Sequence, residues 1–331
     1  MRRLFLVFTI IAVSRLIFSQ PVPAQDENIP FLMTFGNESD ISWGDDDFSQ
    51  AFFFQIPTDY EGQVFIRVFD PDTGGKNDEI RGPWNTQCQF EVYGGIGCHS
   101  EDDARETSPF GNYKSGTLLA MKVFGNDSRY DGQWHTFGPF NPAEGELQNL
   151  AKEYYVFKVI CEGISGDDGN MYNYYLSEKE DRNDDIEGAN AFAYEYSFRM
   201  HNDVNEVSHI YPFIMEGTVQ VQIANFDWDN DGNILVVSTE RQGQTLNISN
   251  EADWVYNTIK VLDGEVGGSY DLQLPKRKTF PPIRNNNVVV NVRNQFDETM
   301  PFYTIPIGGV PEYNKYEGAS EVIDPSMVPK K

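Results

Sequence analysis

The sequence predicts an all-β protein, with two tandem antiparallel β-sandwiches of jelly-roll type related by internal duplication. Two observations carry this prediction. Short runs of β-branched and aromatic residues alternate with polar residues along most of the chain, and Gly, Pro, Asn and Asp punctuate them. Similar segments also recur in the same order in both halves of the 331 residues. Helical periodicity is confined to Glu144–Glu153, where we expect the one helix.

The first 24 residues have the pattern of a secretory signal peptide. Arg2 and Arg3 precede an apolar run over 4–13, and small residues at Val22-Pro23-Ala24 suit cleavage before Gln25. The run is too short to span a bilayer as a helix. An uncleaved amphipathic anchor is the alternative. No later run approaches spanning length, so we expect an exported chain with no membrane span after cleavage.

Composition changes along the chain predict the domain limits. We expect the first sandwich over 25–178 and an acidic linker over 179–189, where polar and charged residues lack periodicity. The second sandwich is expected over 190–307. An exposed C-terminal tail, poor in apolar residues, is expected over 308–331.

Three pairs of segments suggest the duplication. "EGQVFIRVFDPDTGG" from Glu61 resembles "EGTVQVQIANFDWDNDG" from Glu216, which makes Asp70 equivalent to Asp227. "DGQWHTFGPFNPAEGE" resembles "EADWVYNTIKVLDGEV" and pairs the tryptophans at 134 and 254. "VFKVICEGISGDDGNMYNYYLS" resembles "VVVNVRNQFDETMPFYTIPI". The first copy is the longer one, with an insertion at about 81–117, and a loop that outgrows its scaffold is often a binding element.

Acidic loops follow the equivalent strands and suggest calcium. Carboxylates at alternate positions of a tight loop can converge on one ion. In the second copy the candidate ligands are Asp227, Asp229, Asp231 and the backbone of Asn233, with Gly232 at the turn. In the first copy they are Asp70, Asp72, Asn77 and Asp78. Oxygen ligands favour Ca²⁺ over zinc or copper. The alternative for each loop is an acidic β-turn without metal.

The three cysteines give one predicted disulfide. Cys88 and Cys98 flank two short apolar pieces around a Gly-Gly turn, and export permits a local bridge between them. Cys161 lies in a strand-like run and is expected in the core. Three buried thiols are the alternative.

Charge and motifs limit the function. The formal net charge of −26 disfavours nucleic acid and anionic membranes as partners. The sequence has no Gly-x-Ser-x-Gly, His-Glu-x-x-His or phosphate-binding loop. We therefore expect a non-catalytic binding or adhesion module for a carbohydrate or an envelope protein, with Trp84 and Trp228 as candidate sugar-stacking residues. An accessory domain or subunit of a secreted glycosidase or peptidase is the alternative.

Two resemblances bear on the same expectation. "FFFQIPTDYEGQVFIRVFDPD" resembles the strand pattern of bacterial pre-peptidase C-terminal domains, which are small calcium-associated β-sandwiches attached to secreted enzymes. "EGISGDDGNMYNYYLS" and "FDWDNDGNI" are similar to stretches of uncharacterised exported envelope proteins of Gram-negative bacteria. These resemblances imply a location in the periplasm, on the outer surface or in the medium of such a bacterium. They name no substrate.

Overall fold

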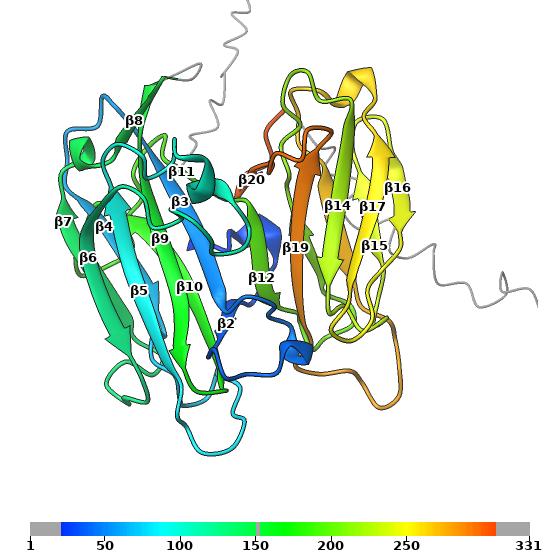
Figure 1. The fold of residues 1–331 in the computed structure, drawn as a ribbon, viewed down its shortest axis with the longest axis horizontal. Helices are drawn as coiled ribbons and strands as arrows, with labels where there is room; N and C mark the ends of the chain where they lie inside the picture. Colours follow the sequence, from blue (N-terminus) through cyan, green and yellow to red (C-terminus); the bar gives the residue numbers. More distant parts are fainter. Residues whose placement is uncertain (1–20, 150–152, 309–331) are drawn as a thin grey trace, which may run out of the picture.

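The computed structural model describes residues 21–149 and 153–308, and its regular secondary structure is mostly antiparallel β-strand. Figure 1 shows two sandwiches side by side, the first from the blue-to-green part of the chain and the second from the green-to-red part. The predicted fold class is confirmed. The predicted signal segment, except for residues 21–24, and the predicted tail beyond Gly308 lie outside the described residues.

Each sandwich has eight principal strands. Those of the first are β2 (Phe31–Phe35), β3 (Ser49–Pro57), β4 (Val64–Phe69), β5 (Gln87–Gly94), β6 (Thr117–Phe124), β7 (Trp134–Phe140), β9 (Glu153–Ser165) and β10 (Gly169–Ser177). Those of the second are β12 (Glu195–Arg199), β13 (Val207–Ile210), β14 (Gln220–Phe226), β15 (Ile234–Val237), β16 (Gln242–Leu246), β17 (Trp254–Lys260), β18 (Asp271–Pro275) and β19 (Asn287–Asn294).

The two halves share one strand order. The first has sheets β2-β10-β4-β7 and β3-β9-β5-β6, and the second has β12-β19-β14-β17 and β13-β18-β15-β16. If the eight strands of each half are numbered along the chain, the two sheets of each half have the strand orders 1-8-3-6 and 2-7-4-5. Two four-stranded sheets with these crossovers form a jelly roll.

A continuous sheet joins the sandwiches. Strand β12 pairs with β2, with Phe198 opposite Leu32, so the order runs β17-β14-β19-β12-β2-β10-β4-β7. Short strand β1 (Pro21–Val22) lies beside β10. On the other layer, β20 (Phe302–Tyr303) and β11 (Asn190–Ala193) extend the sheet of the first sandwich beyond β3. The chain therefore passes into the second sandwich at Tyr194 rather than at residue 190.

Aromatic side chains fill the first sandwich. Phe52 and Phe54 of β3 point inward and contact Tyr174 of β10, while the intervening Phe53 points outward and stacks on Phe192 of β11. All five rings are buried. This outer layer explains why β3 reads as a continuous apolar run, because both of its faces are covered.

The expected helix at Glu144–Glu153 is wrong. A 3₁₀ turn, η4 (Pro142–Glu144), is followed by strand β8 (Glu146–Asn149), which pairs with β9 so that Leu147 faces Tyr155. The edge of β9 offers hydrogen bonds to the whole of β8, and this pairing overrides a modest local helical preference.

The aspartates that the repeat pairs occupy equivalent positions. Asp70 follows β4 and Asp227 follows β14, both with the left-handed backbone (φ 56° and 55°). The preceding residues face the equivalent tryptophans: Phe69 pairs with Trp134 and Phe226 with Trp254. The duplication itself stays a prediction, and superposition of the two halves tests it. The third segment pair is misaligned. It matches β9 with β19, whereas the strand order makes β10 the equivalent of β19.

The longer first copy owes its length to two connections. The predicted insertion at 81–117 includes β5, a core strand of the jelly roll, so the whole segment is not an added hairpin. One of the two connections is 95–116, between β5 and β6, where the second copy has only 238–241, and the other is 70–86, between β4 and β5, where the second copy has only 227–233. We call residues 95–116, which contain the short turn η3 (Asp102–Arg105), the long connection. Within the described ranges, no helix is long and apolar enough to cross a membrane.

Candidate functional site

The long connection and the second sandwich enclose a groove of about 530 Å³. One wall is residues 106–110 of the long connection, and the floor and other wall are the outer face of strands β17, β14 and β19. The groove is lined by Asp46, Glu106, Thr107, Ser108, Phe110, Gln222, Trp254, Tyr256, Asn291, Arg293 and Asp297. Figure 1 shows the long connection, in teal, reaching from the first sandwich toward the second.

Strand register explains why these side chains share one face. Tyr256 faces Ala224, and Ala224 faces Asn291, so the three form a row across the sheet. Gln222 and Arg293 face each other in the next row. Neighbouring residues on the strands point the other way, into the core.

Two aromatic rings lie along one wall. Trp254 and Tyr256, alternate residues of β17, have ring centroids 6.1 Å apart and planes inclined by 21°. Tyr256 is 58% exposed although it is a large ring. On the opposite wall, Phe110 is 52% exposed. Exposed aromatic rings on two sides of one groove form a setting for a flat, partly apolar ligand.

Polar contacts fix both walls. Arg293 on β19 donates to Glu106 at 2.8 Å and to Thr107 at 3.2 Å, which ties the long connection to the second sandwich. Thr299 donates to the backbone oxygen of Arg105 at 2.9 Å. These bonds hold the groove open at a fixed width without ligand, which lowers the ordering cost of binding.

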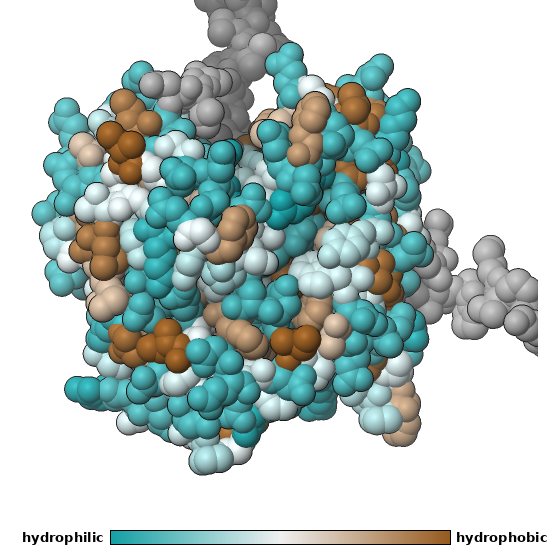
Figure 2. All heavy atoms as spheres, viewed as in Figure 1, coloured by the Kyte–Doolittle hydropathy of each residue, from teal (hydrophilic) through white to brown (hydrophobic). Residues whose placement is uncertain are grey.

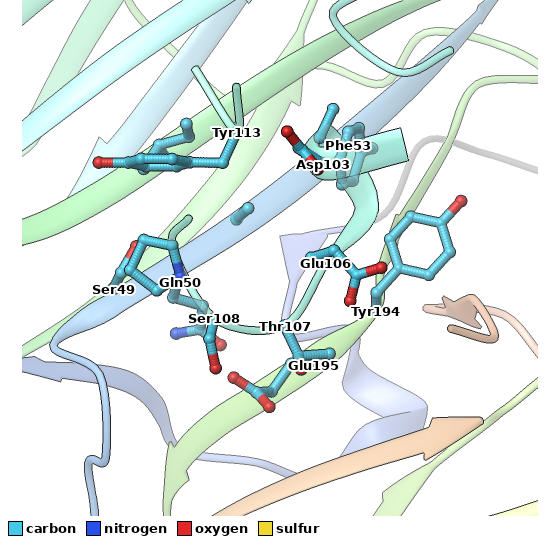
Figure 3. A pocket seen from close by; sticks show the side chains of 14 residues that line it. Ser49, Gln50, Phe53, Asp103, Glu106, Thr107, Ser108, Tyr113, Tyr194 and Glu195 are labelled. Carbon is cyan, nitrogen blue, oxygen red and sulfur yellow. The ribbon is translucent and has the colours of Figure 1, made fainter. Parts of the chain in front are cut away.

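A narrow slot lies behind residues 106–108, with about 30 Å³ of space. Figure 3 shows Glu106, Thr107 and Glu195 grouped at one side of this slot and Tyr113 at another. The space suits one or two waters and is too small for an organic ligand. Figure 2 shows that brown side chains occur only in small groups on the visible face, so the groove does not belong to an extended apolar patch.

The predicted calcium loop of the second copy is spread apart. Asp227 accepts a bond from the backbone of Ala252 at 2.6 Å, and burial raises the pKa of Asp227 to about 7. Asp231 turns to the other side, where it accepts from Asn286 at 3.3 Å and lies near the ammonium of Lys276. Burial and the neighbouring charge of Asp231 raise the pKa of Asp229 to about 6.

The remaining candidate ligand of this loop, Asn233, donates its backbone N–H to the oxygen of Pro275. Calcium at the second loop stays a prediction. Close packing requires glycine at position 232, which the sequence pattern did not predict. A Cβ there would lie 2.3 Å from the backbone oxygen of Pro275 and 2.4 Å from the ring of Trp228.

The first-copy ligands lie close together but are largely engaged. Asp70 accepts from the backbone of Gly132 at 2.6 Å and from Asn77 at 2.5 Å. Asp78 accepts from the backbones of Gly74 at 2.6 Å and Met171 at 2.7 Å. These bonds stabilise the loop after β4 without a metal, and calcium at this loop also stays a prediction.

Asp72 is the exception in this loop. Its Oδ2 accepts from the backbone of Asp127 at 3.2 Å, while its buried Oδ1 has no partner among the described residues. Burial raises the pKa of Asp72 to about 6, and the charges of Asp70 and Asp131 contribute to the rise. Asp131, which the sequence pattern did not single out, therefore belongs to this group.

The two predicted sugar-stacking tryptophans do not line the groove. Trp228 is wholly buried in the core, so its prediction as a surface ligand-binding residue is wrong. The left-handed turn at Asp227 directs the next side chain inward. Trp84 is partly buried in the loop before β5, which Asp168 holds by accepting from the backbones of Asn85 and Thr86.

The predicted Cys88–Cys98 disulfide is wrong, because all three cysteines are free and buried. Cys88 is the second residue of β5, and Cys98 lies four residues beyond the end of that strand at Gly94. Six residues of strand separate Cys88 from Gly94, which is about 20 Å at 3.3 Å per residue. A disulfide needs Cα atoms within about 7 Å. Cys161 lies in the core, as expected.

Sequence reasoning identified Trp254 through the repeat but missed the other groove residues, Tyr256, Gln222, Asn291 and Arg293. The available signal was the polar or aromatic character of alternate positions on β14, β17 and β19, on strands whose other positions are apolar. No family model matches this chain, and a search of curated proteins finds no similar sequence.

Proposed function

We propose that this protein is an exported, non-catalytic binding protein whose groove takes a carbohydrate. The observation that carries the proposal is the pair of nearly parallel rings of Trp254 and Tyr256 along a groove that is otherwise polar. The C–H faces of a sugar ring bury against aromatic faces, while its hydroxyls need hydrogen-bond partners at the edges.

The polar groups of the groove suit hydroxyl recognition. Gln222 offers both a donor and an acceptor, and Arg293 offers donors. A site built to pair hydroxyls discriminates strongly against ligands that lack them. The carboxylates of Glu106 and Asp297 in the same groove disfavour acidic sugars. The groove therefore favours a neutral glycan.

The test is titration calorimetry of the purified protein against a panel of soluble neutral and acidic oligosaccharides. Tyr256→Ala removes an exposed ring without opening the core, and we expect at least a tenfold loss of affinity for the glycan that the wild type binds. Phe280→Ala is the matched control, because Phe280 is 99% exposed and lies outside the groove. Absence of binding to every glycan, or equal affinity of wild type and Tyr256→Ala, would overturn the proposal.

The apolar segment at 4–13 supports an exported location. Fractionation of the native host into cytoplasm, periplasm, membrane and medium tests it. Recovery of the protein from the cytoplasmic fraction alone would contradict export.

A further inference from the structure

Three consecutive carboxylates converge where the two sandwiches meet. Ligand oxygens of Asp45, Asp46 and Asp47, in the loop before β3, all lie within 4.8 Å of one another. Two oxygens bound to one calcium ion at 2.3–2.6 Å can be at most about 5 Å apart. Among the described residues, this is the one group of three or more acidic, His or Cys side chains that meets this condition.

Two of the oxygens in this group lack any partner. Oδ1 of Asp46 and Oδ2 of Asp47 are buried and accept no hydrogen bond from the described residues. A buried carboxylate oxygen without a donor carries a large desolvation cost. The second oxygen of each acid is held in place, that of Asp46 by the indole of Trp254 at 3.2 Å and that of Asp47 by the backbone of Ser49 at 2.9 Å.

Asp45 orients the loop from behind. Its Oδ2 accepts the backbone N–H of Phe35 and its Oδ1 that of Phe48, each at 2.8 Å. These bonds fix the loop that carries the three acids, so convergence is not an accident of free side chains. Burial raises the pKa of Asp45 to about 7 and raises the pKa of Asp46 and Asp47.

A fourth carboxylate faces the loop from the second sandwich. Glu195 on β12 is 8% exposed, and its negative charge raises the pKa of Asp47 further. Asn291 donates to one oxygen of Glu195 at 2.8 Å. Burial and the charge of Asp46 raise the pKa of Glu195 well above its ordinary value, and Arg293, whose guanidinium is already bonded to Glu106, offsets only part of this rise. The four acids, two of them buried and two partly buried, therefore lie beside a base that is engaged elsewhere.

We propose that Asp45, Asp46 and Asp47 bind one divalent cation of the calcium class at this junction, with Glu195 completing its negative surroundings. The ligand set is oxygen only, which suits Ca²⁺ and not zinc or copper. The cation pairs with the unpartnered oxygens and neutralises the like charges. Through the bond between Asp46 and Trp254, the bound cation also orients the aromatic wall of the groove. Cation binding at this site does not require a bound sugar.

The test uses calcium alone, on the chelator-treated full protein, with no glycan present. We expect a calorimetric binding isotherm and a rise of several degrees in melting temperature with calcium, reversed by chelator. Asp47→Asn keeps the size of the side chain and its acceptor for Ser49, and we expect it to weaken calcium binding at least tenfold. Asp59→Asn, at an exposed acid outside the groove and outside the candidate calcium loops, is the matched control and should retain wild-type affinity. Asp229→Asn tests the competing acidic loop of the second copy.

Terbium luminescence supplies a second readout if Asp47→Asn proves unstable. Terbium(III) binds the same oxygen ligands as calcium. When tryptophan is excited, terbium emits only if an indole ring lies near the bound ion. Trp254, bonded to Asp46, should sensitise it, so Trp254→Phe should lose at least half of the emission while calcium still displaces the terbium. The proposal is overturned if wild type binds no calcium, or if Asp229→Asn abolishes binding and Asp47→Asn does not.

Discussion

Trp254 on β17 donates its indole N–H to Oδ2 of Asp46, 3.2 Å away and 208 positions earlier in the chain. This bond, with the Arg293–Glu106 pair, joins the outer face of the second sandwich to two connections of the first. The groove is therefore a product of both halves. Neither jelly roll alone would contain it, since one supplies the aromatic wall and the other supplies the long connection.

Loss of Arg293 should loosen the wall of the groove. The guanidinium is only 20% exposed, and its removal leaves Glu106 without its countercharge next to buried Glu195. We expect Arg293→Ala to lower the free energy of unfolding by about 1–3 kcal/mol, the range for a lost charge-assisted hydrogen bond. Urea unfolding of both proteins measures the difference.

The matched control for this loss is Arg129→Ala. Arg129 also pairs with an aspartate, Asp127, but its side chain is 79% exposed. Exposed pairs contribute little, so we expect a much smaller change than for Arg293→Ala. Equal effects of the two substitutions would show that the Arg293 contacts do not support the fold more than a surface ion pair does.

Buried Glu27 should make stability fall as pH rises. Burial raises the pKa of Glu27 to about 8, although Tyr196 and the backbone of Ala24 each donate to it at 2.6 Å. The ordinary pKa of the unfolded chain is 4.5. Between pH 4.5 and 8 the folded state holds the proton that the unfolded state has lost, so its stability decreases through this window.

Glu27→Gln carries no titrating proton and should lack this decrease. We expect the variant to gain on the order of 2–4 kcal/mol relative to wild type when pH goes from 5 to 8. Urea unfolding at both pH values measures it, and the comparison cancels groups that titrate alike in both proteins. A constant difference between the two proteins would contradict a raised pKa at Glu27.

The cysteines should react only after unfolding. Cys88, Cys98 and Cys161 are all buried and free, and burial raises the pKa of Cys98 to about 12. We expect no alkylation by iodoacetamide in the native protein and three modifications in denaturant without reductant. Mass spectrometry counts them. A denatured species with one modification would reveal a disulfide that the structure lacks.

The sequence was sufficient for the fold because alternation is a local property. Strands such as β14 and β19 show their buried faces directly in the order of residues. The repeat also placed Asp70, Asp227 and the two tryptophans at equivalent strand positions. The insertion expected at about 81–117 includes the long connection, which forms one wall of the groove, and its role in binding stays a prediction.

The predictions that were wrong or missing depended on which residues are neighbours in the folded protein. Cys88 and Cys98 are only ten positions apart in the sequence. Most of the residues between them belong to the extended strand β5, which holds the two cysteines too far apart for a disulfide. Trp228 sits among exposed-looking aspartates, yet one left-handed residue directs it into the core. The groove joins residues from Asp46 to Arg293, and no local pattern connects positions so far apart in the chain.

Lys158 of β9 supports the long connection from below and should give stability the opposite dependence on pH. Its buried ammonium donates to the backbone oxygen of Tyr113 at 2.5 Å and lies over the ring of Tyr93. Burial lowers the pKa of Lys158 from 10.5 to about 8. Between pH 8 and 10.5 the unfolded chain keeps a proton that the folded state has released, so stability rises with pH in this window.

Lys158→Met fills the same space without a charge and should lack this rise. We expect wild type to gain about 2 kcal/mol relative to the variant between pH 7.5 and 10, from a shift of roughly two pKa units at 1.36 kcal/mol each. Urea unfolding at both pH values measures the gain. Because Lys158 holds Tyr113 at the return end of the long connection, the variant should also show faster amide hydrogen exchange at 106–116. Parallel stability curves with unchanged exchange would mean that Lys158 neither titrates near pH 8 nor anchors the connection.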